Sequence, residues 1–287
     1  MKRISIICLF FILLLSCSAR AEKNYPQRII SLSPSITEII YALGAFDRLV
    51  GVSMYTDFPP EAESLPKVGG WVNPSMEAIL KLNPDIVIIL EDQKKIFGDK
   101  LTKLGINALS VDSNPSISHI TKTIIEIGYS IGEKERAIKL KQKIDTDIRN
   151  IKSKTKGVND KKVLCVIGRN PGTLNDIYVI GNSSYINELI TLAGGKNVIE
   201  NKRLSVKITK EAIFSLDPDI IIEVNHDRSL KKEDILNIWK TYDEIRAVKN
   251  DHVYIISSTN LLHPSQRVLS SLKELLSIIQ PEVYAKL

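Results

Sequence analysis

The chain has 287 residues but only three cysteines and four histidines. Two of the cysteines fall within the first 17 residues, so Cys165 stands alone in the rest of the chain and cannot form an intramolecular disulfide. It lies in the strand-like run 162–168 with no histidine close by in the sequence. We therefore predict a buried, unreactive thiol rather than a nucleophile. The histidines lack the spacing of zinc ligands, so we expect no bare-metal site.

Long hydrophobic runs are missing as well, except at the N-terminus. A short positive start precedes the apolar run 4–15, which is too short to cross a bilayer but is typical of a secretory signal. A small-x-small pattern at 19–21 predicts a signal peptide over residues 1–21. A lipobox-like sequence ending at Cys17 predicts instead that this residue is lipidated. Both alternatives predict export, either to the periplasm or to a lipid-anchored position on the outer face of the cell membrane.

Catalytic and nucleic-acid-binding motifs are also missing. The chain contains no glycine-rich phosphate loop, no nucleophile elbow and no His-x-x-x-His zinc helix, so we do not expect an enzyme. The formal net charge is +6, but the lysines are spread along helical stretches, and no basic segment is interleaved with aromatic residues. This pattern is typical of solvated helix faces and predicts no nucleic-acid partner.

What the sequence does contain is an alternation of short apolar runs with helix-period segments. Runs buried on both faces and separated by helices are typical of parallel sheets in α/β proteins. The predicted strands cover residues 28–33, 49–53, 85–90, 108–111, 163–168, 220–224 and 253–256. The predicted helices, apart from one in the middle of the chain, cover residues 36–43, 76–82, 94–104, 117–131, 184–193, 210–216, 235–245 and 265–279.

The remaining helix divides this pattern into two. Residues 133–155 contain no proline or glycine, and their apolar residues recur every three or four positions, which marks a helix with one buried stripe. At 1.5 Å per residue it extends ~35 Å. We therefore predict an α/β fold with two Rossmann-like lobes, residues 27–132 and 161–287, which have parallel sheets and are joined by one long interlobe helix, residues 133–157.

The two predicted lobes contain related sequences. Residues 75–88 match residues 209–222 without a gap, and about half of the positions are identical. Each block contains a short helix, a proline that stops it and a buried strand. Two similar lobes predict a ligand in the cleft between them.

Three segments resemble a known family. Residues 28–38 (RIISLSPSITE), 51–60 (GVSMYTDFPP) and 82–87 (LNPDIV) are similar to the helical-backbone (class III) periplasmic substrate-binding proteins of ABC importers, and most similar to the vitamin B12-binding branch. The resemblance covers almost the whole chain after the signal. It implies a monomer that captures cobalamin, a corrinoid, and delivers it to an ABC importer permease; the alternative ligand is haem or an iron–siderophore complex. It implies no cofactor other than the transported ligand.

The resemblance also assigns part of a ligand pocket. Tyr55 matches a tyrosine that contacts the corrin in the vitamin B12-binding branch, and Trp71 matches a tryptophan of the same pocket. Aromatic faces suit a flat, apolar ligand, although both side chains could instead pack into the core of the lobe. Ser33 and Pro34 end the first predicted strand, and the carboxyl end of a strand faces the ligand crevice in open α/β sheets. Asn170 follows the first strand of the second lobe and is either a crevice residue or part of an ordinary turn.

The matching loop of the second lobe departs from the family pattern. It contributes the candidate ligand-binding residues Thr259, Asn260, Leu261, Leu262 and His263. It lacks the expected tryptophan, and His263 stands where an arginine is expected. This histidine is either a ligand for haem iron or corrinoid cobalt, or a plain helix-start residue. A siderophore pocket would instead need arginines, for which the candidates are Arg169, Arg203 and Arg267.

Two glutamates are candidates for contact with the permease. In the family, each lobe presents a surface glutamate that docks onto permease arginines, and Glu77 and Glu211 occupy these positions. They are also equivalent in the internal repeat. Both could instead act only as first-turn acids that favour the helix dipole.

Overall fold

The computed structural model describes residues 25–113, 115–225, 230–257 and 259–287. The predicted signal peptide, residues 1–21, and the candidate lipidation residue Cys17 lie outside the described residues. No helix in the described ranges has the length and apolar character needed to cross a membrane.

The N-terminal lobe is built on a four-stranded parallel sheet. Its strands, in the order β2-β1-β3-β4, are β1 (Ile29–Ser31), β2 (Leu49–Val52), β3 (Ile86–Leu90) and β4 (Ala108–Val111). Its helices are α2 (Pro34–Ala42), α3 (Met76–Lys81), α4 (Glu91–Lys103) and α5 (Ile117–Ser130), with short 3₁₀ turns at Phe46–Arg48 and Pro60–Ser64. Every residue of β1 and β3 is buried, which explains the uninterrupted apolar sequence of β3 and the two isoleucines that start β1.

The C-terminal lobe is built on a six-stranded mixed sheet. Its main strands follow the order β10-β9-β5-β6-β8, and β7 also pairs with β5. The strands are β5 (Lys161–Gly168), β6 (Ile177–Ile180), β7 (Gly195–Asn197), β8 (Ser205–Ile208), β9 (Ile220–Val224) and β10 (Val253–Ile256). The helical segments are α7 (Tyr185–Leu192), α8 (Lys210–Leu216), α9 (Lys232–Lys240), α10 (Arg246–Lys249), the 3₁₀ turn η3 (Thr259–Leu262), α11 (Val268–Ile279) and α12 (Pro281–Tyr284).

The predicted α/β fold with two lobes is confirmed, with one addition. Strands β5, β9 and β10 are parallel as predicted and β7 is parallel to β5, but β6 runs antiparallel to both of its neighbours, β5 and β8. The short loop between β5 and β6 explains this, because a few residues can return the chain only as a hairpin, whereas parallel strands need a long crossover.

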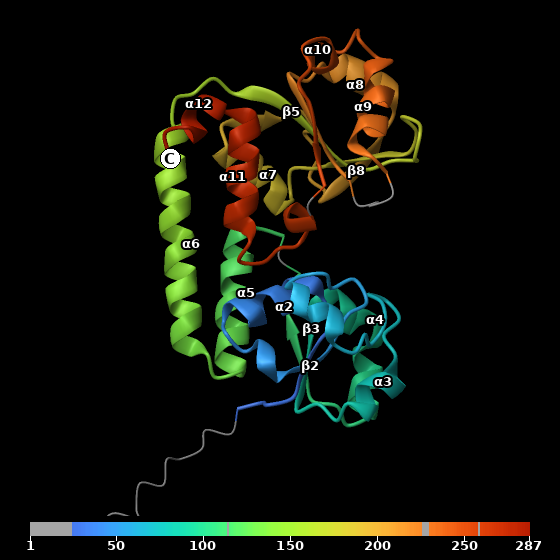
Figure 1. Ribbon diagram of the computed structural model, residues 1–287, viewed down its shortest axis with the longest axis vertical. Coiled ribbons are helices and arrows are strands. Elements are labelled where there is room, and N and C mark those ends of the chain that lie inside the picture. The colour runs from blue at the N-terminus through green and yellow to red at the C-terminus, as the bar shows by residue number, and fades with distance from the viewer. Residues whose placement is uncertain (1–24, 114, 226–229, 258) are drawn as a thin grey trace, which may run out of the picture.

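One long helix lies along both lobes. Helix α6 (Lys134–Thr155) packs against α5 of the N-terminal lobe and against α7 and α11 of the C-terminal lobe (Figure 1). Its inward residues Ala137, Ile144 and Ile151 belong to a hydrophobic cluster that includes core residues of both sheets. The interlobe helix was predicted correctly to within two residues at each end. The limits 27–132 and 161–287 for the lobes stay a prediction.

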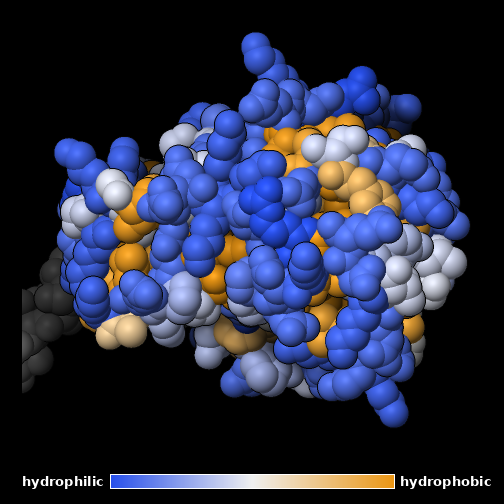
Figure 2. Space-filling view, turned by 90° about the horizontal axis from the view of Figure 1, so that it is seen from above, coloured by the Kyte–Doolittle hydropathy of each residue, from blue (hydrophilic) through white to orange (hydrophobic). Residues whose placement is uncertain are grey.

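Each lobe has a second, separate core on the side of its sheet away from α6. These smaller clusters are centred on Val87 and Ile89 in the N-terminal lobe and on Ile221 and Trp239 in the C-terminal lobe. The end of the molecule seen from above is mainly hydrophilic, with hydrophobic patches between hydrophilic residues (Figure 2). Hydrophobic clusters pack on both faces of each sheet.

Candidate functional site

The principal cavity is a cleft between the two lobes with a volume of about 470 Å³. This lies in the range of pockets that enclose small organic ligands, although the cleft is open to solvent. The N-terminal lobe contributes Ser33, Pro34, Ser35, Tyr55, Trp71, Leu90, Asp92, Ser113 and Pro115. The C-terminal lobe contributes Ile167, Ile180, Ser184, Tyr185, Ile186, Leu204, Ser205, Leu262, His263 and Pro264.

The side of the cleft formed by the N-terminal lobe, here called the N-terminal wall, begins at the ends of parallel strands. Ser33 follows β1 and is the N-cap residue of α2, and Pro34 occupies the first helical position. The Ser33 hydroxyl lies 2.9 Å from that of Ser35. Leu90 ends β3 and Ser113 follows β4, so the carboxyl ends of three neighbouring strands meet at the cleft, as expected for an open α/β sheet.

Tyr55 and Trp71 form the aromatic part of the same wall. The Tyr55 side chain is 61% exposed, and neither residue belongs to a hydrophobic core cluster of the described residues. The alternative that they pack the core is therefore wrong. The Trp71 loop is held in place because the buried amide of Gln93 donates to the carbonyl oxygens of Trp71 (3.1 Å) and Leu32 (2.9 Å).

The candidate loop of the C-terminal lobe is only partly in the cleft. Leu262 and His263 line the cleft, whereas Thr259, Asn260 and Leu261 do not. Leu261 is fully buried, and its carbonyl oxygen accepts a hydrogen bond from the Tyr185 hydroxyl at 2.5 Å. The Thr259 hydroxyl lies 3.4 Å from Asp57 Oδ2, and the Asn260 carbonyl accepts from the backbone N–H of His263. These three residues support the loop rather than line the cavity.

Asn170 also lies outside the cleft lining. It is exposed in the loop between β5 and β6, where its side-chain amide donates to Asp176 at 2.7 Å. The turn interpretation of this residue therefore matches the structure.

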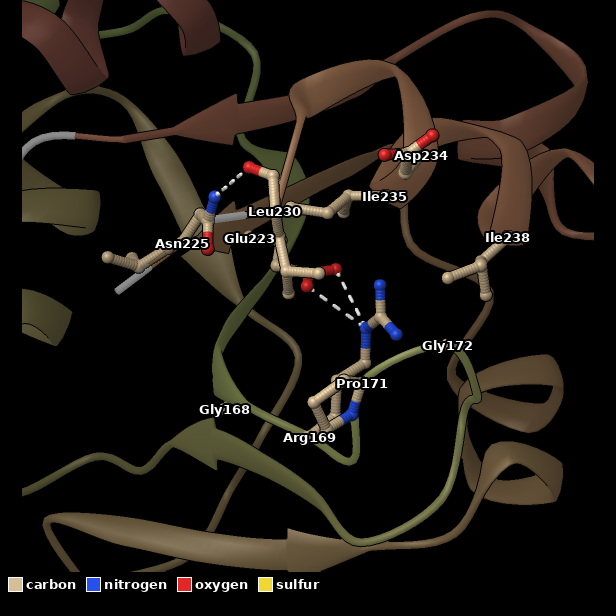
Figure 3. A pocket seen from close by; sticks show the side chains of 11 residues that line it. Gly168, Arg169, Pro171, Gly172, Glu223, Asn225, Leu230, Asp234, Ile235 and Ile238 are labelled. Atoms are coloured by element: carbon tan, nitrogen blue, oxygen red, sulfur yellow. Dashed lines mark hydrogen bonds and ion pairs between the residues drawn. The ribbon is translucent and has the colours of Figure 1, made fainter. Parts of the chain in front are cut away.

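A second cavity of about 170 Å³ lies next to this loop, between the ends of β5 and β9 and helix α9 (Figure 3). Its wall contains an ion pair between Arg169 and Glu223, whose side chains are only 4% and 8% exposed. The Trp239 indole N–H also donates to Glu223 at 2.6 Å. Arg169 and Glu223 thus neutralise one another, whereas the third charged residue of the lining, Asp234, is exposed.

The arginines considered for a siderophore do not line the cleft. Arg169 pairs with Glu223, and Arg267 binds Glu38 and stacks at 3.9 Å on the ring of Phe58. Arg203 is exposed and is not part of the lining, although the next two residues are. The lining has no lysine or arginine among the described residues, and its one carboxylate, Asp92, has its pKa lowered by the hydrogen bond from Lys95. The arrangement suits a flat, largely apolar ligand more than a polyanion.

His263 is held by a buried carboxylate of the opposite lobe. Glu38, on α2, is fully buried. Its Oε1 lies 2.9 Å from His263 Nδ1 and 3.3 Å from Arg267 Nη1, and its Oε2 accepts from the Ser265 hydroxyl at 2.5 Å. A buried carboxylate needs such partners to offset its loss of hydration. These contacts also tie the two lobes together directly at the edge of the cleft.

A carboxylate of the C-terminal lobe accepts a hydrogen bond from the N-terminal lobe. Glu188, on α7, accepts the backbone N–H of Ile117 at 3.1 Å. Ile117 is the first residue of α5, where the N–H groups have no partner within the helix. Carboxylates of both lobes thus accept hydrogen bonds from the opposite lobe: Glu38 and Asp57 from the N-terminal lobe and Glu188 from the C-terminal lobe.

Several lining residues were not predicted. Leu90 and Ser113 could have been found, because they end strands whose order the parallel pattern implies. Tyr185 and Ile186 start α7. Leu204 precedes the edge strand β8 and Ser205 starts it, and no sequence signal revealed this strand. Burial raises the pKa of the Tyr185 hydroxyl, with a further contribution from the charge of Glu38, so this side chain stays neutral.

The two candidate docking glutamates lie outside the cleft. Glu77 and Glu211 are exposed in the first turns of α3 and α8. Figure 1 shows these helices in different lobes, on the side of the molecule away from α6. The backbone N–H of Glu211 and the Thr209 hydroxyl lower the pKa of the Glu211 carboxyl, which keeps it charged.

Comparison with known proteins decides the family. The model of the family described as "Periplasmic binding protein" matches residues 29–259. The chain belongs to this family. Its members are solute-binding proteins rather than enzymes, which supports the predicted non-enzymatic role and a small-molecule ligand.

Individual relatives and structures span nearly the same length. An uncharacterized ABC transporter substrate-binding lipoprotein of Bacillus subtilis, YvrC, is 31% identical over 91% of this chain and 82% of its own. A vitamin B12-binding protein of Vibrio parahaemolyticus is 25% identical over 93% and 94%. The crystal structure of a possible iron-binding, periplasmic solute-binding protein of Staphylococcus epidermidis is 27% identical, covers 90% and 100%, and has a TM-score of 0.76.

Proposed function

We propose that this periplasmic binding protein captures a corrinoid such as cobalamin in the cleft between its lobes and delivers it to an ABC importer. The observation that carries the proposal is the lining of the cleft: aromatic and aliphatic side chains from both lobes, with serines between them and no lysine or arginine among the described residues. Such a lining offers contact area to a large flat ring and leaves a few polar groups to orient it.

The names of related proteins support this choice. One relative is a vitamin B12-binding protein, and another is named as a substrate-binding lipoprotein of an ABC transporter. They support an extracytoplasmic location and a permease partner for this chain. Tyr55 and Trp71, which are assigned to the corrin by resemblance, both line the cleft.

The alternative cargo is haem or an iron–siderophore complex. The structural relative from Staphylococcus epidermidis is described as a possible iron-binding protein. A haem has the same flat shape as a corrin and fits the same argument. A siderophore fits less well, because Arg169, Arg203 and Arg267 lie outside the cleft lining.

Calorimetric titration of the purified chain from Glu22 onward tests the proposal, with cyanocobalamin, haemin and ferrichrome as parallel ligands. We expect one-to-one binding of cyanocobalamin. Substitution of Tyr55→Ala or Trp71→Ala removes an aromatic contact from the rim of the cleft, and each is expected to raise Kd about tenfold or more. Tyr284→Ala is the matched control, since Tyr284 is 44% exposed and does not line the cleft.

Each outcome assigns the cargo. Saturable binding of haemin or ferrichrome, without binding of cyanocobalamin, would support the transport role but assign haem or a siderophore as the cargo in place of a corrinoid. No binding of any of the three ligands would reject the proposal.

A further inference from the structure

The lining of the cleft contains a carboxylate but no basic side chain to match it. Among the described residues, Asp92 is the only acid that lines the cleft, and no lysine or arginine lines it. Most of the other polar groups are serine hydroxyls, which can donate or accept a hydrogen bond, whereas a carboxylate can only accept. The cleft therefore offers a negatively charged acceptor to the cargo that it encloses.

The position of Asp92 is set by the sheet of the N-terminal lobe. The residue follows the end of β3 and lies in the first turn of α4, at the edge of the sheet where the strands end and the ligand crevice of an open α/β sheet begins. Its side chain is 47% exposed. The carboxylate is therefore fixed in place at the wall of the cleft and open to a ligand.

The Asp92 carboxylate is charged and can accept further hydrogen bonds. The hydrogen bond from Lys95, which reaches Oδ1 at 2.9 Å, and that from Ser113 lower the pKa of this carboxyl. A carboxylate can accept about four hydrogen bonds, so these two leave room for a donor from the cargo. Lys95 lies outside the lining and is 74% exposed, so solvent screens its charge.

Flat macrocycles of similar shape differ in the groups around the edge of the ring. The corrin ring of cobalamin carries carboxamides, whose N–H groups can donate to a carboxylate. The porphyrin of haem carries propionates, which can only accept and are negatively charged. A propionate beside Asp92 would bring two negative charges together without a cation from the described lining, and such charges are costly to enclose unpaired.

We propose that Asp92 determines specificity for the edge of the cargo ring: its carboxylate accepts a hydrogen bond from a carboxamide N–H and disfavours a carboxylate at the same position. This inference rests on the proposed function. It narrows the cargo class to macrocycles with amidated side chains, and it selects against haem and against corrinoids whose amides have been hydrolysed to acids.

The experiment compares cyanocobalamin with its monocarboxylic acids, in which one carboxamide at the edge of the ring is replaced by a carboxylate. Each separated isomer is titrated calorimetrically into the purified protein at neutral pH, and haemin is the third probe. We expect at least one isomer to bind about tenfold or more weakly than cyanocobalamin, because it loses a hydrogen bond to a charged acceptor and gains a repulsion.

Variants of Asp92 separate the effect of its charge from that of simple contact. Asp92→Asn keeps an acceptor and adds an amide donor, so cyanocobalamin affinity should stay within about threefold, and the preference over the acid should fall to about threefold or less. Asp92→Ala removes the acceptor and should weaken cyanocobalamin binding about tenfold. Circular dichroism checks that each variant is folded.

Asp99→Asn is the matched control. Asp99 is an exposed acid on the same helix, but it does not line the cleft. The variant removes the same charge from the protein and should keep the full preference for cyanocobalamin over the acid.

The outcomes separate this inference from the proposed function. Equal affinity for cyanocobalamin and all of its acids, or a preference that Asp92→Asn leaves unchanged, would overturn the inference while the corrinoid function stands. Tighter binding of haemin than of cyanocobalamin would overturn both. Binding of none of the macrocycles would also overturn both.

Discussion

Arg169 and Glu223 show how strongly one buried contact can affect stability. Their side chains are almost inaccessible to solvent, and Glu223 also accepts from the Trp239 indole. Removal of one charge from such a pair leaves the other buried without its counter-ion, which costs more than the pair itself contributes.

We expect Arg169→Met to lower the free energy of unfolding by about 3–5 kcal/mol. The double variant Arg169→Met/Glu223→Leu should lose less free energy of unfolding than the sum of the losses in the two single variants, because no unpaired charge remains. Urea unfolding measures the free energy of unfolding of the single and double variants. Lys95→Met, which breaks the exposed pair with Asp92, should leave the midpoint unchanged; an equal loss in Lys95→Met and Arg169→Met would contradict the argument.

Single residues of the site were predictable only when a pattern marked them. Tyr55, Trp71 and His263 stood in loops that resemble a known pocket, and all three line the cleft. Glu38 carried no signal, because charged side chains are normally exposed and its partners lie more than 220 residues away in the sequence. The burial of Cys165 was predictable from its apolar run, and burial raises its thiol pKa to about 12.

At the level of elements, the sequence repeat corresponds to a structural repeat. Helices α3 and α8 are capped in the same way, by the hydroxyls of Ser75 and Thr209. Each is followed by a residue with positive φ, Asn83 at 44° and Asp217 at 41°. Strands β3 and β9 then enter their sheets beside β1 and β5. One local sequence pattern thus builds the same unit twice.

Of the missed strands, β6 is a short apolar run (Ile-Tyr-Val-Ile) that was not assigned from the sequence, whereas β7 and β8 lack an apolar period. Strand β7 reads Gly-Lys-Asn, and β8 alternates polar residues with partly buried ones at the edge of the sheet, so neither shows an uninterrupted hydrophobic run. The helix predicted over 235–245 ends at Lys240. The apolar spacing continues to Ile245, but this side chain reaches the core from the turn that precedes α10.

Helix α6 is the element whose packing should make unfolding cooperative. Ile144 is fully buried at its centre, in the cluster shared by both lobes. We expect Ile144→Ala to cost about 2–5 kcal/mol through lost burial and a cavity, and to destabilise both lobes together. Lys143→Ala, at the neighbouring exposed position, should leave stability unchanged.

The two tryptophans allow the unfolding of each lobe to be measured separately. Trp71 belongs to the N-terminal lobe and Trp239 to the core of the C-terminal lobe. In a Trp71→Phe background, fluorescence follows the C-terminal lobe while circular dichroism follows the whole chain. Coincident transitions that shift together in Ile144→Ala would agree with the shared core. Two separated transitions would show that the lobes unfold independently.

At the level of the whole molecule, we propose that Glu77 and Glu211, one exposed on each lobe, are a pair of contacts for the permease. We expect Glu77→Lys or Glu211→Lys to reduce uptake about tenfold or more in vesicles that contain the partner permease, because like charges facing one another cost several kcal/mol. Cyanocobalamin affinity in solution should not change, since neither residue lines the cleft.

Glu135→Lys provides the matched control for docking. Glu135 is an exposed first-turn acid like the other two, but it lies on α6, on the opposite side of the molecule (Figure 1). A loss of uptake as large as that of the other two variants would mean that net charge, rather than a specific contact, governs delivery.

The antiparallel pair of strands β6 and β8 has a consequence for the orientation of the cargo. This pair exists only in the C-terminal lobe, where Ser205 at the start of β8 and the preceding Leu204 line the cleft opposite the aromatic wall of Tyr55 and Trp71. The two walls therefore differ in shape and chemistry, although the lobes share a repeated unit. A cargo with two different faces would therefore bind in one orientation with a lower free energy than in the flipped orientation. Each bound cargo molecule should then enter the translocation pathway with the same face leading.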